Sequence, residues 1–224
     1  MTSNAAPRAR RSRLGPPIPR EFYSRATEIV ARDLLGAVLE VHSPGGIASG
    51  RIVETEAYVG EHDLACHAVA GRTARTEPLY GAPGIAYVYL IYGMYWCFNA
   101  VTRAENEPSA VLVRAVEPLD GLALMRRRRP KAKRDVDLTN GPGKLCLALG
   151  IGREHNRVRL DRPPLLIRRG DAIADGDVVV TPRIGITQSA DWPLRYFVRD
   201  NPYVSKTPPT FPRTAYRRPS VREL

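Results

Sequence analysis

Cysteine and histidine are scarce in this sequence, which limits the chemistry that it can support. The 224 residues include three cysteines, Cys66, Cys97 and Cys146, and four histidines. An odd number of cysteines in apolar surroundings predicts a reducing environment and no disulfide framework. The segment 61–67 contains acidic, histidine and cysteine side chains, but no second cluster follows it at zinc-finger spacing. We therefore expect no metal site.

Long apolar runs are absent as well. No stretch of the chain reaches the roughly 18 uninterrupted apolar residues of a membrane span. The first 20 residues contain five arginines and no apolar block, so they do not resemble a secretory signal. We expect no membrane partner. The expected location is cytoplasmic and nucleoid-associated in a bacterium, and nuclear in a eukaryote.

Acidic residues are rare at both ends of the chain. Residues 1–20 have five arginines and no acidic residue, and residues 206–224 have five cationic residues and one acidic residue. The formal net charge of +11 therefore lies mostly at the ends. Because both ends are also rich in proline, we predict a disordered basic tail over 1–19 and a basic, Pro-rich tail over 207–224. One domain is expected over 20–206, with tails that bind nucleic-acid phosphates.

A run of cations inside the domain is a second candidate for phosphate binding. Residues 126–134 contain seven cations, beginning with Arg126, Arg127 and Arg128. Such a run either contacts a phosphate backbone or forms a solvated loop whose charges repel one another. The sequence leaves both interpretations open.

The segment Gly141–Lys144 lacks the full pattern of a nucleotide-binding loop. Such a loop needs a glycine five residues before Gly143 and a serine or threonine after Lys144, but this chain has leucine at both places. What remains is a glycine-rich helix start, at which Gly143 and Lys144 are able to hold one backbone phosphate. A simple helix start is the alternative.

Apolar periodicity and the positions of glycine and proline divide the chain into short elements. Helices are predicted over 24–34, from Pro118 to the arginine run, and just after Gly143. The predicted strands cover residues 37–42, 50–58, 86–91, 95–101, 110–116, 163–168, 177–187 and 194–199. Paired strands with a few peripheral helices predict an α+β fold, with one domain built on an antiparallel sheet.

Two carboxylates and a phenol share one face of the predicted strand 50–58. Alternation along a strand places Glu54, Glu56 and Tyr58 on the same side. One carboxylate there is suited to act as a general base for water beside an aromatic wall. Surface strands also carry such residues, so spacing alone does not decide between the two.

Aromatic residues gather in the predicted hairpin 86–101. Four of the ten tyrosines of the chain lie here, and Gly93 marks the place where the chain reverses. Aromatic rings at a protruding tip are suited to insertion between base pairs or stacking on an extruded base. A buried hairpin with an aromatic core is the alternative, and Tyr87 and Trp96 fit that role.

In order and spacing, these motifs resemble the alkyladenine (3-methyladenine) DNA glycosylase family. The resemblance covers about residues 34–205 and rests on Glu54-Thr55-Glu56-Ala57-Tyr58, His67, Tyr89-Leu90-Ile91-Tyr92-Gly93-Met94, Asn99, Arg114-Ala115-Val116-Glu117-Pro118, Gly141-Pro142-Gly143-Lys144-Leu145-Cys146 and Leu194-Arg195-Tyr196-Phe197-Val198-Arg199. The stretch 73–80 departs from the family pattern, with Ala74 in place of an expected proline and Thr76 in place of an asparagine. This departure affects the rim of the expected pocket and so bears on lesion preference.

The resemblance implies a catalytic pair. Glu56 would activate the water that attacks the sugar C1′ and would stabilise the oxocarbenium-like transition state. Arg114 would help to hold that water or the phosphate beside the sugar. Glu54 would then be structural, because one activated water needs one base.

The resemblance also implies how the base is held. Tyr58, His67 and Tyr89 would enclose the flipped base, and their electron-rich rings would favour a cationic purine. Tyr92 would enter by the minor groove and fill the gap left in the stack. Asn99 would stand where the exocyclic amine of a normal guanine must go, which excludes that base.

The resemblance implies a monofunctional enzyme of base-excision repair. Its substrates would be 3-methyladenine, 7-methylguanine, hypoxanthine and ethenoadenine in double-stranded DNA, and its product an abasic site. The expected architecture is a curved antiparallel sheet with a protruding tyrosine-bearing hairpin, without metal or organic cofactor, in a monomer. An RNA- or lesion-binding protein of the same fold without hydrolytic activity is the alternative.

Overall fold

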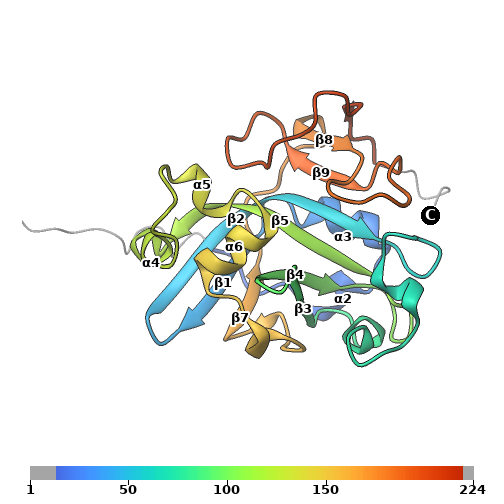
Figure 1. Ribbon diagram of the computed structural model, residues 1–224, viewed down its shortest axis with the longest axis horizontal. Helices are drawn as coiled ribbons and strands as arrows, with labels where there is room; N and C mark the ends of the chain where they lie inside the picture. The colour runs from blue at the N-terminus through green and yellow to red at the C-terminus, as the bar shows by residue number, and fades with distance from the viewer. Residues whose placement is uncertain (1–13, 219–224) are drawn as a thin grey trace, which may run out of the picture.

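Strand β2 (Gly46–Tyr58) is the element around which the sheet is organised (Figure 1). Along one edge, β2 pairs with β5 (Ala110–Asp120) over most of its length. Along the other edge, it pairs first with β1 (Val38–Ser43) and then with β9 (Arg195–Val198). The last residues of β2 are therefore held between two neighbours. This placement buries Glu54 and Glu56 completely.

The remaining strands extend this arrangement in three directions. β7 (Leu165–Arg168) and β6 (Asp161–Arg162) follow β1, while β8 (Val178–Thr181) and β10 (Thr214–Ala215) follow β9. β3 (Ala86–Ile91) and β4 (Tyr95–Val101) form a hairpin that joins the sheet through β5. Every pairing among these strands is antiparallel, as expected from the sequence.

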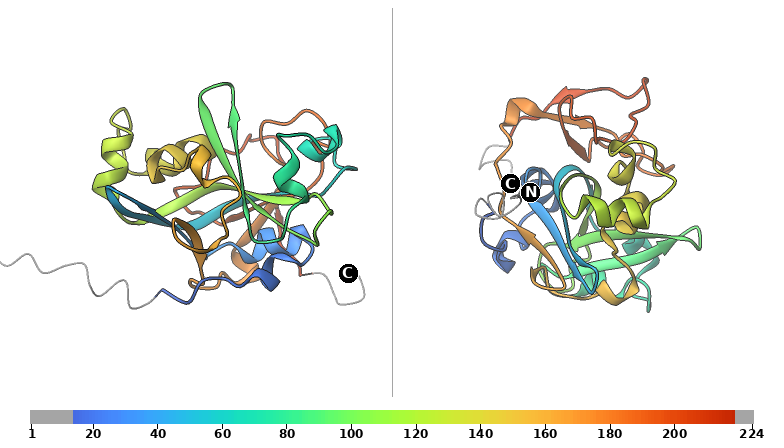
Figure 2. Two further views of the ribbon diagram at one scale, coloured as in Figure 1. Left: turned by 90° about the horizontal axis from the view of Figure 1, so that it is seen from below. Right: turned by 90° about the vertical axis from the view of Figure 1, so that its left-hand side faces the viewer.

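Short helices cover the sheet at its margins (Figures 1 and 2). They are α2 (Arg20–Tyr23), α3 (Thr27–Asp33), α4 (Leu122–Arg128), α5 (Val136–Thr139) and α6 (Pro142–Leu149), with single-turn helices η1 (His67–Ala70), η2 (Glu77–Tyr80), η3 (Arg153–His155) and η4 (Asp175–Asp177). α6 packs against β4 and β5, whereas α3 lies against β2, where the Thr55 hydroxyl donates to the Ala31 carbonyl at 2.8 Å. The architecture is a single α+β domain, which confirms the predicted fold class.

The β3–β4 hairpin stands away from the body of the domain (Figure 2, left, green). Both of its strands have the predicted limits, because the apolar alternation and Gly93 are local signals. At its tip the Met94 N–H donates to the Ile91 carbonyl at 3.2 Å, and both Tyr92 and Gly93 have positive φ angles of 53° and 70°. These are the features of the tight turns that join twisted antiparallel strands.

The prediction of a helix starting at Pro118 was wrong. β5 continues through Pro118, which pairs with Gly50, and ends at Asp120. α4 begins only after Gly121, whose φ is 76°. A Cβ at Gly121 would lie 2.5 Å from the Ile47 carbonyl oxygen, so the turn into α4 requires glycine. Proline is tolerated here because the pairing around Gly50 is irregular.

Other boundaries also differ. The helix predicted over 24–34 is the shorter α3 (27–33), with α2 as a separate turn before it, and the strand predicted over 177–187 ends at Thr181. α6 begins at Pro142 rather than after Gly143. A proline in the first helical turn is favourable because its missing N–H has no partner there anyway.

The structure describes residues 14–218. Residues 14–18 lie along β7, with Pro17 bridged to Arg168 and Ile18 buried. At the other end, β10 pairs with β8 and the Tyr216 N–H donates to the Val178 carbonyl at 3.0 Å. The domain thus continues on both sides of the predicted limits 20–206, because a few apolar residues in each predicted tail find partners in the sheet. The rest of those tails, 1–13 and 219–224, lies outside the described residues.

Within the described range, no helix combines the length and the apolar character that crossing a membrane would require.

Candidate active site

The carboxylate of Glu56 lies at the buried end of β2 and accepts three hydrogen bonds. Its Oε2 accepts from the Tyr58 hydroxyl at 3.0 Å and from Arg114 Nη1 at 3.1 Å, and its Oε1 accepts from the backbone N–H of Ile184 at 2.8 Å. The donors come from β2, from β5 and from the loop after β8. They fix the plane of the carboxylate from both sides.

Glu54 is the centre of a second, larger network. Its Oε1 accepts from Arg114 Nε at 3.0 Å, from Arg195 Nε at 2.7 Å and from the Ser205 hydroxyl at 2.7 Å. Burial alone would raise the pKa of Glu54, but the charges of the two arginines and the hydrogen bonds from Ser205 hold that pKa below its ordinary value. Arg114 bridges the two glutamates and its own pKa is raised by them, against the effect of burial. Glu54 therefore stays ionised and fixes Arg114 beside Glu56.

The four residues expected to hold a base line a single cavity. Tyr58, His67, Tyr89 and Asn99 surround a space of about 20 Å³, which is completed by Ala65, Cys66, Leu79, Tyr87 and Ala110. The residues come from the end of β2, from η1, from β3 and from β4. The fold therefore brings together side chains that lie up to 41 positions apart, and Tyr58 links this cavity to Glu56.

The rings of His67 and Tyr89 touch in this structure. Their centroids are 4.5 Å apart and their planes are nearly perpendicular. A purine between two flat walls needs contact at roughly 3.5 Å on each face, and a cavity of about 20 Å³ has room for about one water molecule. Entry of a base therefore requires these rings to separate.

His67 is oriented by a residue that the sequence analysis assigned to the core. The Tyr87 hydroxyl lies 2.9 Å from His67 Nδ1, and Tyr87 itself is buried. Burial, with a further contribution from the positive charge of Arg75, lowers the pKa of His67. The imidazole is therefore neutral at pH 7. Tyr87 was missed as a positioning residue because alternation on β3 gives no sign of a contact with η1.

Asn99 lies on β4 and faces the same cavity. Its Nδ2 donates to the Tyr87 carbonyl at 3.1 Å, and the side chain is buried. The hydrogen bond fixes the amide plane at the back of the pocket. A rigid amide in this place is able to exclude a base substituent by contact.

Tyr92 occupies the tip of the hairpin and is 80% exposed. Its positive φ is a backbone conformation that costs a residue with a side chain roughly 1–2 kcal/mol. Neither burial nor backbone geometry explains a tyrosine here. The ring of Tyr92 therefore adds nothing to the packed core of the domain.

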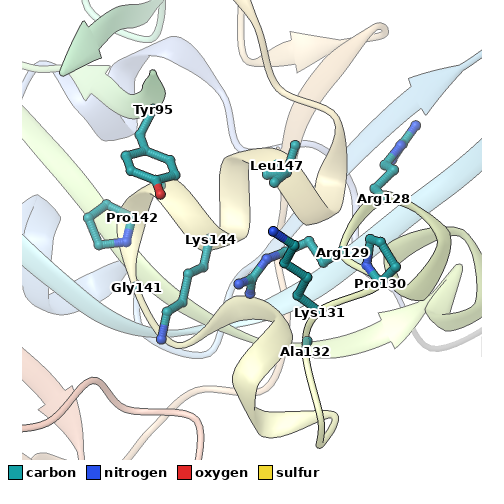
Figure 3. A pocket seen from close by; sticks show the side chains of 11 residues that line it. Tyr95, Arg128, Arg129, Pro130, Lys131, Ala132, Gly141, Pro142, Lys144 and Leu147 are labelled. Atoms are coloured by element: carbon teal, nitrogen blue, oxygen red, sulfur yellow. The ribbon is translucent and has the colours of Figure 1, made fainter. Parts of the chain in front are cut away.

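A groove beside the hairpin collects several of the predicted phosphate ligands (Figure 3). It has a volume of about 550 Å³ and lies between Tyr95, the loop Arg129–Ala132 and the start of α6 with Gly143 and Lys144. A Cβ on Gly143 would come within 2.9 Å of Tyr95, so glycine lets α6 approach the hairpin. Lys144 donates to Asn140 Oδ1 at 2.8 Å and remains at the groove.

The three arginines at the start of the run 126–134 have different surroundings. Arg128 donates to the carbonyls of Ala148 and Leu149 at 3.1 and 2.6 Å, so it satisfies the C-terminal end of α6 rather than facing solvent. Arg126 forms an exposed two-point ion pair with Asp135. Arg127 is exposed and makes no ion pair within the described part of the chain. Of the three, Arg127 is the one left open to an outside phosphate.

A buried ion pair behind Tyr58 was not foreseen. Arg183 donates to both oxygens of Asp63 and to the Ala57 carbonyl, and all of these groups are buried. The guanidinium carbon also lies 4.7 Å from the centroid of the Tyr58 ring. The pair ties the end of β2 to the loop that leads to His67 and to the loop that carries Ile184. The sequence offered Asp63 only as part of an apparent metal cluster, and no grouping of three potential metal ligands is found within residues 14–218.

Fold and site define a class of protein: an α+β domain in which a buried, arginine-bound carboxylate adjoins a small aromatic pocket. Comparison with known proteins makes this specific. Residues 21–202 match the model of the family described as methylpurine-DNA glycosylase. The chain belongs to this family of DNA glycosylases.

Individual relatives cover most of the chain. A protein of Myxococcus xanthus is 52% identical over 195 residues, which is 86% of this chain and 95% of that protein. A protein of Methanocella arvoryzae is 46% identical over 198 residues, which is 87% of this chain and 98% of that protein. Both carry the name "Putative 3-methyladenine DNA glycosylase".

Proposed function

We propose that the protein removes damaged purines from double-stranded DNA by hydrolysing the N-glycosidic bond with a water activated by Glu56. The observation that carries this proposal is the contact of 3.0 Å between the Tyr58 hydroxyl and Glu56, because Tyr58 also forms a wall of the aromatic pocket. A base held against Tyr58 would bring its sugar close to the carboxylate. The substrates proposed are 3-methyladenine, in accord with the names of the relatives, and 7-methylguanine, hypoxanthine and ethenoadenine.

Glu56 retains the capacity to bind the attacking water. An ionised carboxylate has about four acceptor positions, and three are taken by Tyr58, Arg114 and Ile184. The fourth accepts an O–H from water, which Glu56 deprotonates as the oxygen bonds to C1′. The C1′–N bond breaks and its electron pair leaves with the purine. Arg114 holds the carboxylate in place through this step.

Release of free base from defined duplexes tests the proposal. Duplexes that contain 3-methyladenine or hypoxanthine should yield the free base and an intact strand with an abasic site. A lesion-binding protein without hydrolysis would retain the duplex and release nothing, and an RNA-binding module would prefer single-stranded RNA. Strand cleavage without added alkali would contradict the monofunctional mechanism.

Tyr92→Ala should reduce the population of flipped base by about 10–100-fold. Flipping costs a few kcal/mol, and a base–aromatic contact returns about 1–3 kcal/mol of it. Fluorescence of ethenoadenine or 2-aminopurine in the duplex reports the flipped state. Tyr92→Phe keeps the ring and should flip normally. Equal flipping by wild type and Tyr92→Ala would show that the ring does not enter the stack, and the same assay on Met94→Ala would then identify the wedge.

Asn99→Ala should release guanine from undamaged or mispaired sites, which the wild type leaves intact. Its amide is fixed by the Tyr87 carbonyl at the back of the pocket, so removing it opens room for an exocyclic amine. The measurement is guanine release, with thermal unfolding to establish that the fold is retained. A folded Asn99→Ala that still refuses guanine would place discrimination elsewhere.

Positive charge supplies the sequence-independent part of the proposed binding. Gly143 and Lys144 line the groove beside the hairpin, where a backbone phosphate would meet the start of α6, and the exposed Arg127 would add a further cation. The cations at the chain ends would add affinity that falls as salt rises. We further propose a monomer that works without cofactor, on the nucleoid of a bacterium or in the nucleus of a eukaryote.

A further inference from the structure

Two of the three phenols that line the pocket, Tyr58 and Tyr89, already have an arginine beside the ring. The guanidinium carbon of Arg183 is 4.7 Å from the centroid of Tyr58, and that of Arg75 is 5.3 Å from the centroid of Tyr89. The attraction of a ring for a cation comes from its electron-rich face. The protein's own arginines therefore already use part of the attraction of both rings for a cation.

The two arginines differ in their counter-charge. Arg183 forms a two-point ion pair with Asp63, so its charge is largely compensated. Arg75 is exposed, donates to the Leu90 carbonyl at 3.3 Å and has no acidic partner within residues 14–218. Arg75 thus places an uncompensated positive charge at the wall of the pocket. It lies in the stretch 73–80, where the sequence departs from the family pattern.

The field of Arg75 reaches the other rings of the pocket. Burial lowers the pKa of His67, and the charge of Arg75 lowers it further. Burial raises the pKa of Tyr87 to about 12, against which Arg75 acts by charge and by hydrogen bonding. A base between His67 and Tyr89 would experience the same positive charge.

Damaged purines fall into two electrostatic classes. Purines alkylated at N3 or N7 are cations, and they leave as neutral bases when the C1′–N bond breaks. Hypoxanthine and ethenoadenine are neutral, so the same electron pair gives them negative charge as they leave. A fixed cation beside the pocket repels the first class when it binds and stabilises the second class as it departs.

We infer that Arg75 is a specificity-determining residue that shifts this enzyme toward neutral damaged purines and away from cationic alkylated ones. The inference rests on the proposed function and deepens it. The sequence analysis expected the electron-rich rings to favour a cationic base. That preference is weakened here, because Arg75 and Arg183 already lie beside two of these rings.

The test compares two second-order rate constants for single-turnover release at subsaturating enzyme, one for hypoxanthine and one for 7-methylguanine, so that the effect of Arg75 on binding is included. Arg75→Gln removes the charge while retaining a donor for the Leu90 carbonyl. The ratio of the hypoxanthine rate to the 7-methylguanine rate should fall by roughly tenfold. Arg75→Lys retains the charge and should keep the ratio near that of the wild type.

Arg72→Gln is the matched control. Arg72 lies three residues earlier, and its guanidinium carbon is likewise 5.3 Å from a tyrosine ring, that of Tyr80. Tyr80 does not line the base cavity, and Arg72 is paired with Glu77. This variant should leave the ratio unchanged.

An unchanged ratio in Arg75→Gln, or an equal fall of both rates, would overturn the inference, as would an equal shift of the ratio in Arg72→Gln. These outcomes leave the proposed function standing, since both bases are still released. Failure of the wild type to release either base would instead contradict the proposed function itself.

Discussion

Glu56→Gln should slow the release of damaged bases by about 10²–10⁴-fold, the usual contribution of a general base, while lesion-containing duplexes still bind. The amide has nearly the size of the carboxylate but cannot take a proton from water at neutral pH. Its orientation would still be constrained by the Tyr58 hydroxyl and the Ile184 N–H. The measurement is single-turnover base release at saturating enzyme, with fluorescence anisotropy for binding.

Glu61→Gln provides the control for this substitution. Glu61 is exposed, follows β2 by three residues and accepts from the Tyr80 hydroxyl at 3.0 Å, outside the base cavity. It should release bases at the wild-type rate. Near-normal release by Glu56→Gln would remove Glu56 from the role of general base, and the water would have to be activated by another group.

Glu54→Gln should destabilise the domain by about 3–5 kcal/mol, the range found when one partner of a buried ion pair is removed. Arg195 is fully buried and has its shortest hydrogen bond, 2.7 Å, with Glu54. Without the carboxylate, the charges of Arg195 and Arg114 are left with insufficient compensation. Urea denaturation measures the loss, and Glu61→Gln should show almost none.

The effect of Glu54 on stability should depend on pH in a defined direction. Because its pKa in the folded protein lies below the ordinary value of 4.5, the ionised form contributes stability above that value. The contribution is lost as the pH falls through the folded pKa, where Glu54 becomes protonated. The difference between wild type and Glu54→Gln should therefore be largest near neutral pH and shrink in acid. A difference that is small at pH 7, or constant down to acid, would contradict the role of Glu54 as the centre of the network.

The hairpin and the face of β2 were the parts of the site that could best be predicted from the sequence. The limits of β3 and β4 followed from alternation and from one glycine, which are local signals. Alternation also placed Glu54, Glu56 and Tyr58 together. It did not show that the two carboxylates are fully buried, because burial comes from β5 and β9, and β9 lies some 140 residues further along the chain.

The partners of charged groups were the part of the site that the sequence predicted least well. The run of arginines left phosphate contact and a solvated loop both open, and neither describes Arg128, which donates to the carbonyls at the end of α6. The pair of Asp63 and Arg183 joins positions 120 residues apart, and no local pattern marks it. Helix ends and buried charges find their partners through tertiary structure, so their contacts follow only once the fold is known.

The contact between His67 and Tyr89 has a consequence for how the enzyme surveys a genome. Separating the two rings costs the same free energy whichever base enters, so it lowers the affinity for every extruded base by one common factor. Selectivity between damaged and normal purines is unaffected by such a factor. The time that the protein stays at each normal purine becomes shorter, because the affinity is lower. Since normal purines outnumber lesions by many orders of magnitude, this shortens the whole search. On the proposed function, the contact between these two rings favours a fast search of DNA over tight binding of each extruded base.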